Sequence, residues 1–78
     1  MTYLSASAIA RLEAKSLMAA NKAMRAGRYG PLLKRGHIAY AALPAVERHV
    51  GQRFTPEQIA AAVAGQPGRM LVIERLED

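Results

Sequence analysis

The chain has 78 residues, with eleven Lys or Arg against six Asp or Glu, and no cysteine. A chain this short buries only about 60% of its unfolded surface, which favours a binding role over a deep catalytic pocket. The lack of cysteine excludes disulfides and thiolate metal sites, and no apolar run approaches the roughly 18 residues of a membrane span. Since the first residues also lack signal-peptide features, we expect a cytoplasmic protein.

The positive charge is concentrated in one part of the chain. Residues 1–51 carry eight Lys or Arg against two acids, a net charge of +6, whereas residues 52–78 carry three against four, a net charge of −1. Six of the eight cations lie between Lys15 and Arg35. Such a basic stripe is typical of a polyanion binder, but charge alone is explained equally well by a solvated surface.

The residues after Leu4 predict a first helix. Ser5 or Ser7 can cap it, because a serine oxygen accepts an unpaired amide proton of the first turn. Ile9 and Leu12 lie three residues apart and give this helix an apolar face.

A second helix is predicted from Leu17 to Ala26, capped by Ser16 and closed by Gly27. Its apolar strip at helical spacing consists of Ala20, Ala23 and Met24. Residues 7–26 are so rich in helix-forming side chains that one unbroken helix is the alternative. We prefer two, because one long helix would place Lys15 on its apolar side.

Gly30-Pro31 ends the helical pattern, and a β-hairpin is predicted next. Leu32-Leu33 and Ile38–Tyr40 are its arms. Lys34, Arg35 and His37 cluster around Gly36 in the expected turn, where glycine permits the required backbone.

Two further helices and a strand are predicted beyond the hairpin. Pro44 suits the first turn of a short helix closed by Gly51. Thr55 and Gln58 form a capping-box pattern for another helix, which ends before Gly65. The apolar residues 70–73 indicate a strand, and residues 74–78 a charged tail. We therefore divide the chain into residues 1–51 and residues 52–78.

The second helix is the candidate reader of DNA. A helix fits the major groove, where Asn can bond adenine and Arg can bond guanine through paired contacts. Asn21 and Arg25 lie four residues apart on one face, with Lys22 beside them for phosphate. The alternative is an ordinary solvated helix face. The basic hairpin that directly follows this helix favours DNA binding over that alternative.

The candidates for chemistry are few. His37 and His49 are twelve residues apart on different predicted elements, and no pair of carboxylates has metal-ligand spacing. We expect Tyr29 and Tyr40 to fill the wing or the core, and Met18 and Met24 read most simply as core residues. The sequence predicts no enzyme, no metal and no cofactor.

From Leu4 to Gly51 the chain resembles MerR-like excisionases. The residues that carry the resemblance in the helical region are Leu4-Ser5, Ile9-Ala10, Leu12, Ser16, Ala20, Met24–Gly27 and Pro31. The later run RGHIAYAALPAVERHVG is similar to the wing of that family and the helix after it. Glu13, Ala14 and Lys15 replace the family's usual Leu-Gly-Val at the turn between the two helices.

The order of these predicted elements and the resemblance both imply a mainly α fold with a small β-hairpin wing: a winged helix-turn-helix DNA-binding domain followed by a C-terminal helix and short strand. It implies an excisionase, or recombination directionality factor, acting on double-stranded DNA beside an integrase in a bacterial or phage-infected cell. Taken together, the predicted DNA-binding residues are Ser16, Leu17, Met18, Asn21, Lys22, Arg25, Arg28, Lys34, Arg35 and His37.

The segment from Thr55 onward is not needed for a minimal winged domain. It suits self-association on DNA or contact with an integrase; alternatively, residues 70–73 pair with the hairpin and complete the core. For the whole chain, the alternatives are a transcriptional regulator of a mobile element and, in another class, a small protein-binding inhibitor. Affinity for duplex DNA that falls steeply with salt separates DNA binders from the last class.

Overall fold

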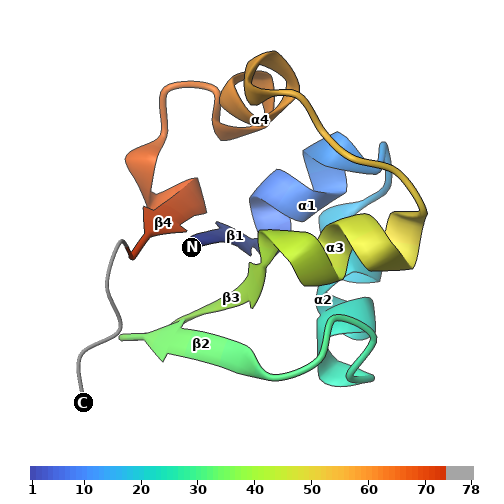
Figure 1. Cartoon of the computed structure of the whole chain (residues 1–78). Helices are drawn as coiled ribbons and strands as arrows, with labels where there is room; N and C mark the ends of the chain where they lie inside the picture. Colours follow the sequence, from blue (N-terminus) through green and yellow to red (C-terminus); the bar gives the residue numbers. More distant parts are fainter. Residues whose placement is uncertain (74–78) are drawn as a thin grey trace.

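A four-stranded antiparallel sheet runs through the molecule (Figure 1), and the computed structural model describes residues 1–73. Its strands are β1 (Thr2–Ser5), β2 (Leu32–Arg35), β3 (Ile38–Ala42) and β4 (Met70–Val72), in the spatial order β2-β3-β1-β4. The helices are α1 (Ala6–Leu12), α2 (Leu17–Arg25), α3 (Leu43–Val50) and α4 (Pro56–Val63), and a 3-10 turn, η1, covers Pro67–Arg69.

The expectation of a mainly α fold with a small hairpin wing is wrong, because the chain is an α/β domain. The missed element is β1, which pairs with β3 on one side and with β4 on the other. Leu4 lies opposite both Ala41 and Met70. A four-residue strand is too short to show its own periodicity, and its pairing partners lie far along the chain.

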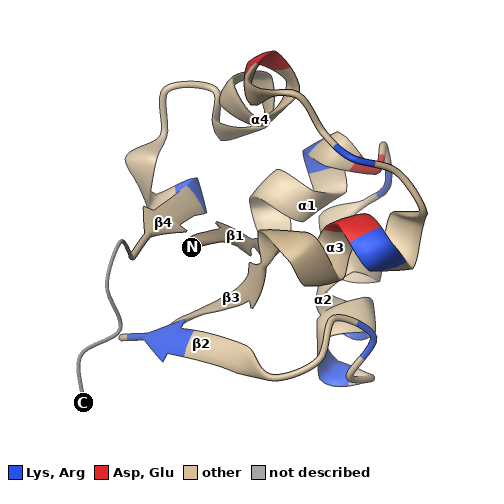
Figure 2. Ribbon diagram, in the orientation of Figure 1, with Lys and Arg blue, Asp and Glu red and all other residues tan. Residues whose placement is uncertain are grey.

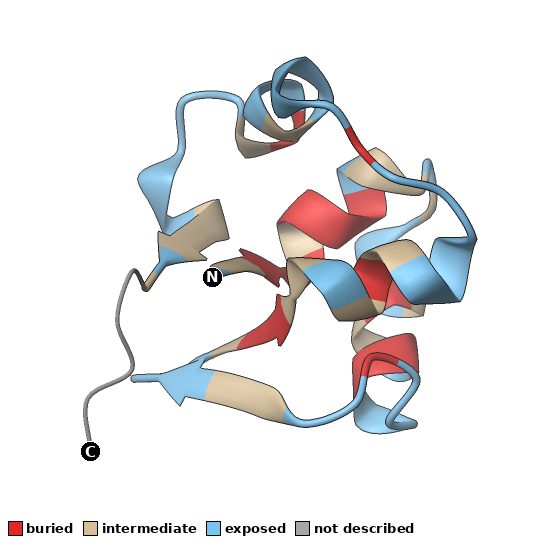
Figure 3. Ribbon diagram, in the orientation of Figure 1, coloured by how far each residue is buried: buried red, intermediate tan, exposed pale blue. Residues whose placement is uncertain are grey.

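The core forms where one face of the sheet meets the helices. Residues directly opposite each other in a sheet share a face, so Leu4, Ala41 and Met70 all point toward it. Leu4 and Ile9 are fully buried, and the predicted strip Ala20, Ala23 and Met24 of α2 packs into the same cluster. Figure 3 shows the buried residues gathered on α1, α2 and the adjoining ends of β1 and β3.

The first helical region is two helices, as predicted, and not one. Ser5 caps α1, because its Oγ accepts a hydrogen bond from the Ala8 amide at 3.4 Å. Ser16 caps α2 in the same way, accepting from the Ala19 amide at 3.0 Å. After α2, Gly27 has φ +77, the left-handed conformation expected where a helix closes.

The hairpin of β2 and β3 is confirmed, but its turn is tighter than predicted. Lys34 and Arg35 belong to β2 and pair with Ala39 and Ile38. Only Gly36 and His37 form the connection, and Gly36 has φ +61. A two-residue connection matches the twist of the two strands, which is why the ladder extends through Arg35.

The segment after residue 51 is built into the same sheet and core. The capping box of Thr55 and Gln58 is present at the start of α4, α4 packs against α1, and β4 pairs with β1. Residues 70–72 therefore pair within the chain, although with β1 and not with the hairpin. The charged tail at 74–78 lies outside the described residues. Within residues 1–73, no helix is both long and apolar enough to cross a bilayer.

Candidate nucleic-acid interface

The outer face of α2 is basic and exposed. Lys22 and Arg25 lie on the side of the helix opposite the buried Ala20 and Met24, and both are exposed. Arg28 is exposed in the segment after α2. Figure 2 shows this concentration of Lys and Arg toward the end of α2, together with a second one on β2. The burial pattern of α2 thus leaves its cations facing solvent.

The start of α2 carries exposed apolar side chains. Met24 is 4% exposed and belongs to the core, but Met18 is 81% exposed, so its interpretation as a core residue is wrong. Leu17 is 52% exposed. Ser16 is exposed as well, and its hydroxyl oxygen is engaged in capping the helix. The first turn of α2 therefore presents apolar surface beside the basic face.

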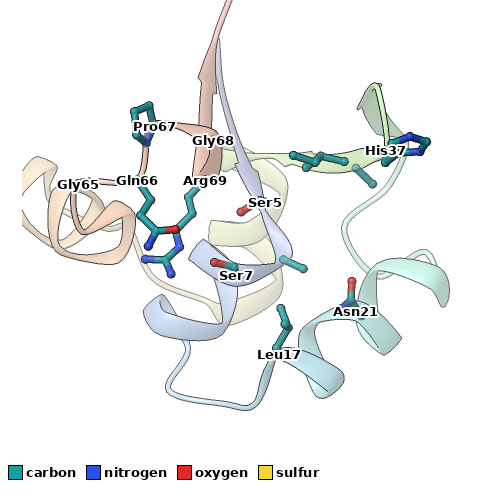
Figure 4. Close-up of a pocket in the computed structure, with 13 residues that line it drawn as sticks. Ser5, Ser7, Leu17, Asn21, His37, Gly65, Gln66, Pro67, Gly68 and Arg69 are labelled. Carbon is teal, nitrogen blue, oxygen red and sulfur yellow. The ribbon is translucent and has the colours of Figure 1, made fainter.

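A groove of about 720 Å³ joins α2 to the hairpin (Figure 4). Leu17 and Asn21 of α2 line it on one side, and His37 and Ile38 line it at the end of the hairpin. The structure thus brings the predicted residues of the helix and the wing together through Asn21 and His37. Lys34 and Arg35 do not line this groove.

The other wall of the groove was not predicted. It consists of Gln66, Arg69 and their neighbours in the segment from Gly65, with Ser7 of α1 between the two walls. The Arg69 guanidinium donates to the Val63 carbonyl oxygen at 3.2 Å, which ties this segment to the end of α4. No local sequence signal reveals the wall, because it forms only when the chain returns past α1 to reach β4.

Lys34 and Arg35 are exposed on β2, at one edge of the sheet. Consecutive residues of a strand point to opposite faces, so the two cations do not form one cluster around the turn. Lys34 shares its face with Ala39, and Arg35 shares the other face with Ile38. The hairpin therefore offers positive charge on both of its faces.

A partly buried hydrogen-bond cluster fixes the position of α2. Tyr29, only 1% exposed, donates from its hydroxyl to Glu13 Oε2 at 3.0 Å and accepts from Lys15 Nζ at 3.1 Å. Lys15 and Glu13 also form an ion pair at 2.6 Å. Because Glu13 and Lys15 stand in the turn before α2 and Tyr29 follows it, the cluster anchors both ends of the helix.

Both titratable donors of this cluster have raised pKa values. Burial raises the pKa of the Tyr29 phenol above 10.0 and outweighs the hydrogen bond from Lys15, which lowers it. Burial lowers the pKa of Lys15, but its hydrogen bonds to Glu13 and Tyr29 outweigh this and leave it above 10.5. At neutral pH the phenol is therefore protonated and Lys15 is charged, which is the arrangement that the hydrogen bonds require.

The exposed cations of α2 and β2 have no carboxylate partner among the described residues. Within residues 1–73 the single ion pair joins Lys15 and Glu13. The exposed cations of α2 and β2 are thus not neutralised by any carboxylate that the structure describes. In the same part of the chain, no group of three or more His, Asp or Glu is arranged to hold a metal ion.

A second hollow lies on the other flank of α2, and sequence analysis missed one of its residues. Lys22 and Arg28 line it, as does His49 of α3, which was considered only as a metal ligand. The His49 ring packs edge-on against Tyr29 at this position, with the ring centroids 5.1 Å apart.

Comparisons with protein-family models, with curated proteins and with solved structures found no match for the chain.

Proposed function

We propose that the protein is a sequence-specific DNA-binding protein of the winged helix-turn-helix kind that promotes excisive site-specific recombination. In this proposal α1 and α2 are the helix-turn-helix, and β2 and β3 are the wing. The observation that supports it best is the exposed basic face of α2, which lies beside a groove that Asn21 of this helix shares with His37 of the hairpin.

The side chains of α2 suit the major groove of DNA. The groove is about 12 Å wide and admits one α-helix. Arg25 is exposed and can make paired hydrogen bonds to guanine, and Asn21 can do the same to adenine. Leu17 and Met18, which are otherwise costly to expose, would gain contact with thymine methyl groups.

The cations around α2 suit the phosphate backbone. Lys22 and Arg28 flank the helix, and Lys34 and Arg35 extend along β2. Contacts to phosphate fix the orientation of a protein on the duplex without reading its sequence. Base contacts from α2, together with phosphate contacts from the cations on either side, would be sufficient for sequence-specific binding.

Excision control is the biological role that we propose for this binding. Several copies bound side by side beside an attachment site would bend the DNA, at a cost of a few kcal/mol that added phosphate contacts offset. The bent complex would then let an integrase act in the excisive direction. Self-association of the protein on DNA and contact with the integrase are both part of this proposal.

The decisive experiment combines the partner integrase with DNA that carries the attachment sites, so that excision releases a DNA circle. We expect excised circles to accumulate with the wild-type protein and to be lost with Arg25→Ala. Arg48→Ala, an exposed cation on α3, is the matched control and should excise normally. Excision that proceeds equally well without the protein, alongside specific binding at a promoter, would instead identify a transcriptional regulator.

The protein-binding alternative is tested separately. Affinity for duplex DNA should fall linearly with salt on logarithmic axes, with a slope near −0.9 for each phosphate contact. A protein that uses its basic face for an acidic protein partner would show weak duplex binding and no preference between DNA sequences.

A further inference from the structure

The hollow on the second flank of α2 has a volume of about 300 Å³ and a basic lining. Its lining cations come from separate places: Lys22 on α2, Arg28 in the following segment, and Lys15 in the turn before α2. His49 of α3 joins them. We call this hollow, lined also by Ala19, Ala23 and Ala26, the basic hollow.

The charges in the basic hollow are only partly compensated. Lys15 is paired with Glu13, but no Asp or Glu lines the hollow itself. Lys22 and Arg28 are exposed and form no ion pair with a described residue. The remaining lining residues are alanines, whose small side chains leave room beside α2. The hollow thus combines positive charge with space for a small anion.

The imidazole of His49 is exposed but contacts one buried aromatic ring of the core. The Tyr29 ring meets it at an interplanar angle of 83°, and Tyr29 is itself fixed by hydrogen bonds to Glu13 and Lys15. A donor that is already oriented loses little conformational entropy when it forms a hydrogen bond. Because His49 also lines the hollow, its imidazole can donate a hydrogen bond to an anion bound there.

We propose that the basic hollow binds one phosphate of the DNA backbone, with Lys22 and Arg28 supplying charge and His49 donating a hydrogen bond. This inference rests on the proposed function, because the phosphate belongs to the DNA that α2 reads. Arginine suits a phosphate particularly well, since its planar group can donate two parallel hydrogen bonds. The contact fixes how α2 sits in the major groove and adds α3 to the interface.

The principal test is His49→Phe, which keeps an aromatic ring against Tyr29 but removes the N–H donors. We expect its affinity to fall about 10- to 100-fold for every duplex, as for the loss of one hydrogen bond to a charged group. The ratio of specific to non-specific affinity should not change. Arg28→Ala should lower the salt slope by about 1. Arg48→Ala, the neighbouring residue of α3, lines a different hollow and is the matched control.

A second measurement separates this inference from the proposed function. Inorganic phosphate is titrated into the wild-type protein, and amide chemical shifts at Arg28 and His49 are followed by NMR. If the protein binds DNA but His49→Phe and Arg28→Ala both behave like Arg48→Ala, the basic hollow is not a phosphate site. If the protein binds no duplex, the proposed function fails, and the phosphate titration decides: localised shifts support an anion site, and their absence overturns it. Circular dichroism checks that each variant is folded, and Arg28→Ala carries the test if His49→Phe is not.

Discussion

Ala14 is in a backbone conformation that costs stability, and replacing it with glycine should make the protein more stable. Its φ is +54, in the left-handed region, where an L-residue with a Cβ is disfavoured by roughly 1–2 kcal/mol. The strained residue stands in the turn that separates α1 from α2. The conformation of Ala14 therefore lowers the free energy of unfolding, and a glycine at this position would avoid that loss.

The magnitude follows from the surroundings of the residue. Ala14 is exposed, so its methyl group contributes little burial, and the backbone hydrogen bond from Lys15 to the Ala10 carbonyl, at 2.9 Å, does not depend on it. Glycine adds an entropic cost of about 0.5–1 kcal/mol because the unfolded chain gains freedom. Ala14→Gly should thus raise the free energy of unfolding by about 0.5–1 kcal/mol, or the melting temperature by roughly 2–8 °C in a domain of this size.

Urea denaturation and thermal melting followed by circular dichroism measure the change, with two matched variants. Ala64→Gly, at φ +51 after α4, should stabilise by a similar amount. Ala60→Gly, exposed within α4, should destabilise by about 1 kcal/mol, because glycine is a poor helix former. If Ala14→Gly lowers stability as Ala60→Gly does, the left-handed strain is not real and the reasoning is refuted.

Three other predictions concern DNA binding and pH. Arg25→Ala should reduce the binding free energy at the specific site by about 1–3 kcal/mol and weaken the base preference there, whereas Lys22→Ala should weaken binding to all duplexes alike. Competition binding measures the specificity ratio of the wild type and of both variants. Equal ratios in all three proteins would contradict the assignment of α2 as the helix that reads DNA. Replacing Lys34 and Arg35 with Ala should shorten the nuclease footprint at one edge without unfolding the sheet, since both are exposed; an unchanged footprint would make β2 a surface strand only. The free energy of unfolding should fall as pH rises above about 10, because the pKa of Tyr29 is raised in the folded state and the unfolded chain loses that proton first. Denaturation between about pH 8 and 11 should show a shallower fall for Tyr29→Phe, and parallel curves would contradict this account.

Features that depend on neighbouring residues were predictable from the sequence. The serine cap of α2, the capping box of Thr55 and Gln58, and the glycine at residue 27 all act within a few residues of the helix end that they stabilise. The apolar strip of α2 was predictable for the same reason, because a helix converts sequence spacing directly into a face. That strip also indicated that Lys22 and Arg25 would be exposed.

The sheet and the walls of the candidate site depended on tertiary structure. Strand β1 exists because β3 and β4 both supply its hydrogen bonds, and neither partner is recognisable from four residues near the N-terminus. His49 and Arg69 approach α2 only after α3 and β4 have packed. Contacts between residues so distant along the chain are selected by the burial of a shared apolar core, and no local pattern records which distant side chains that core brings together.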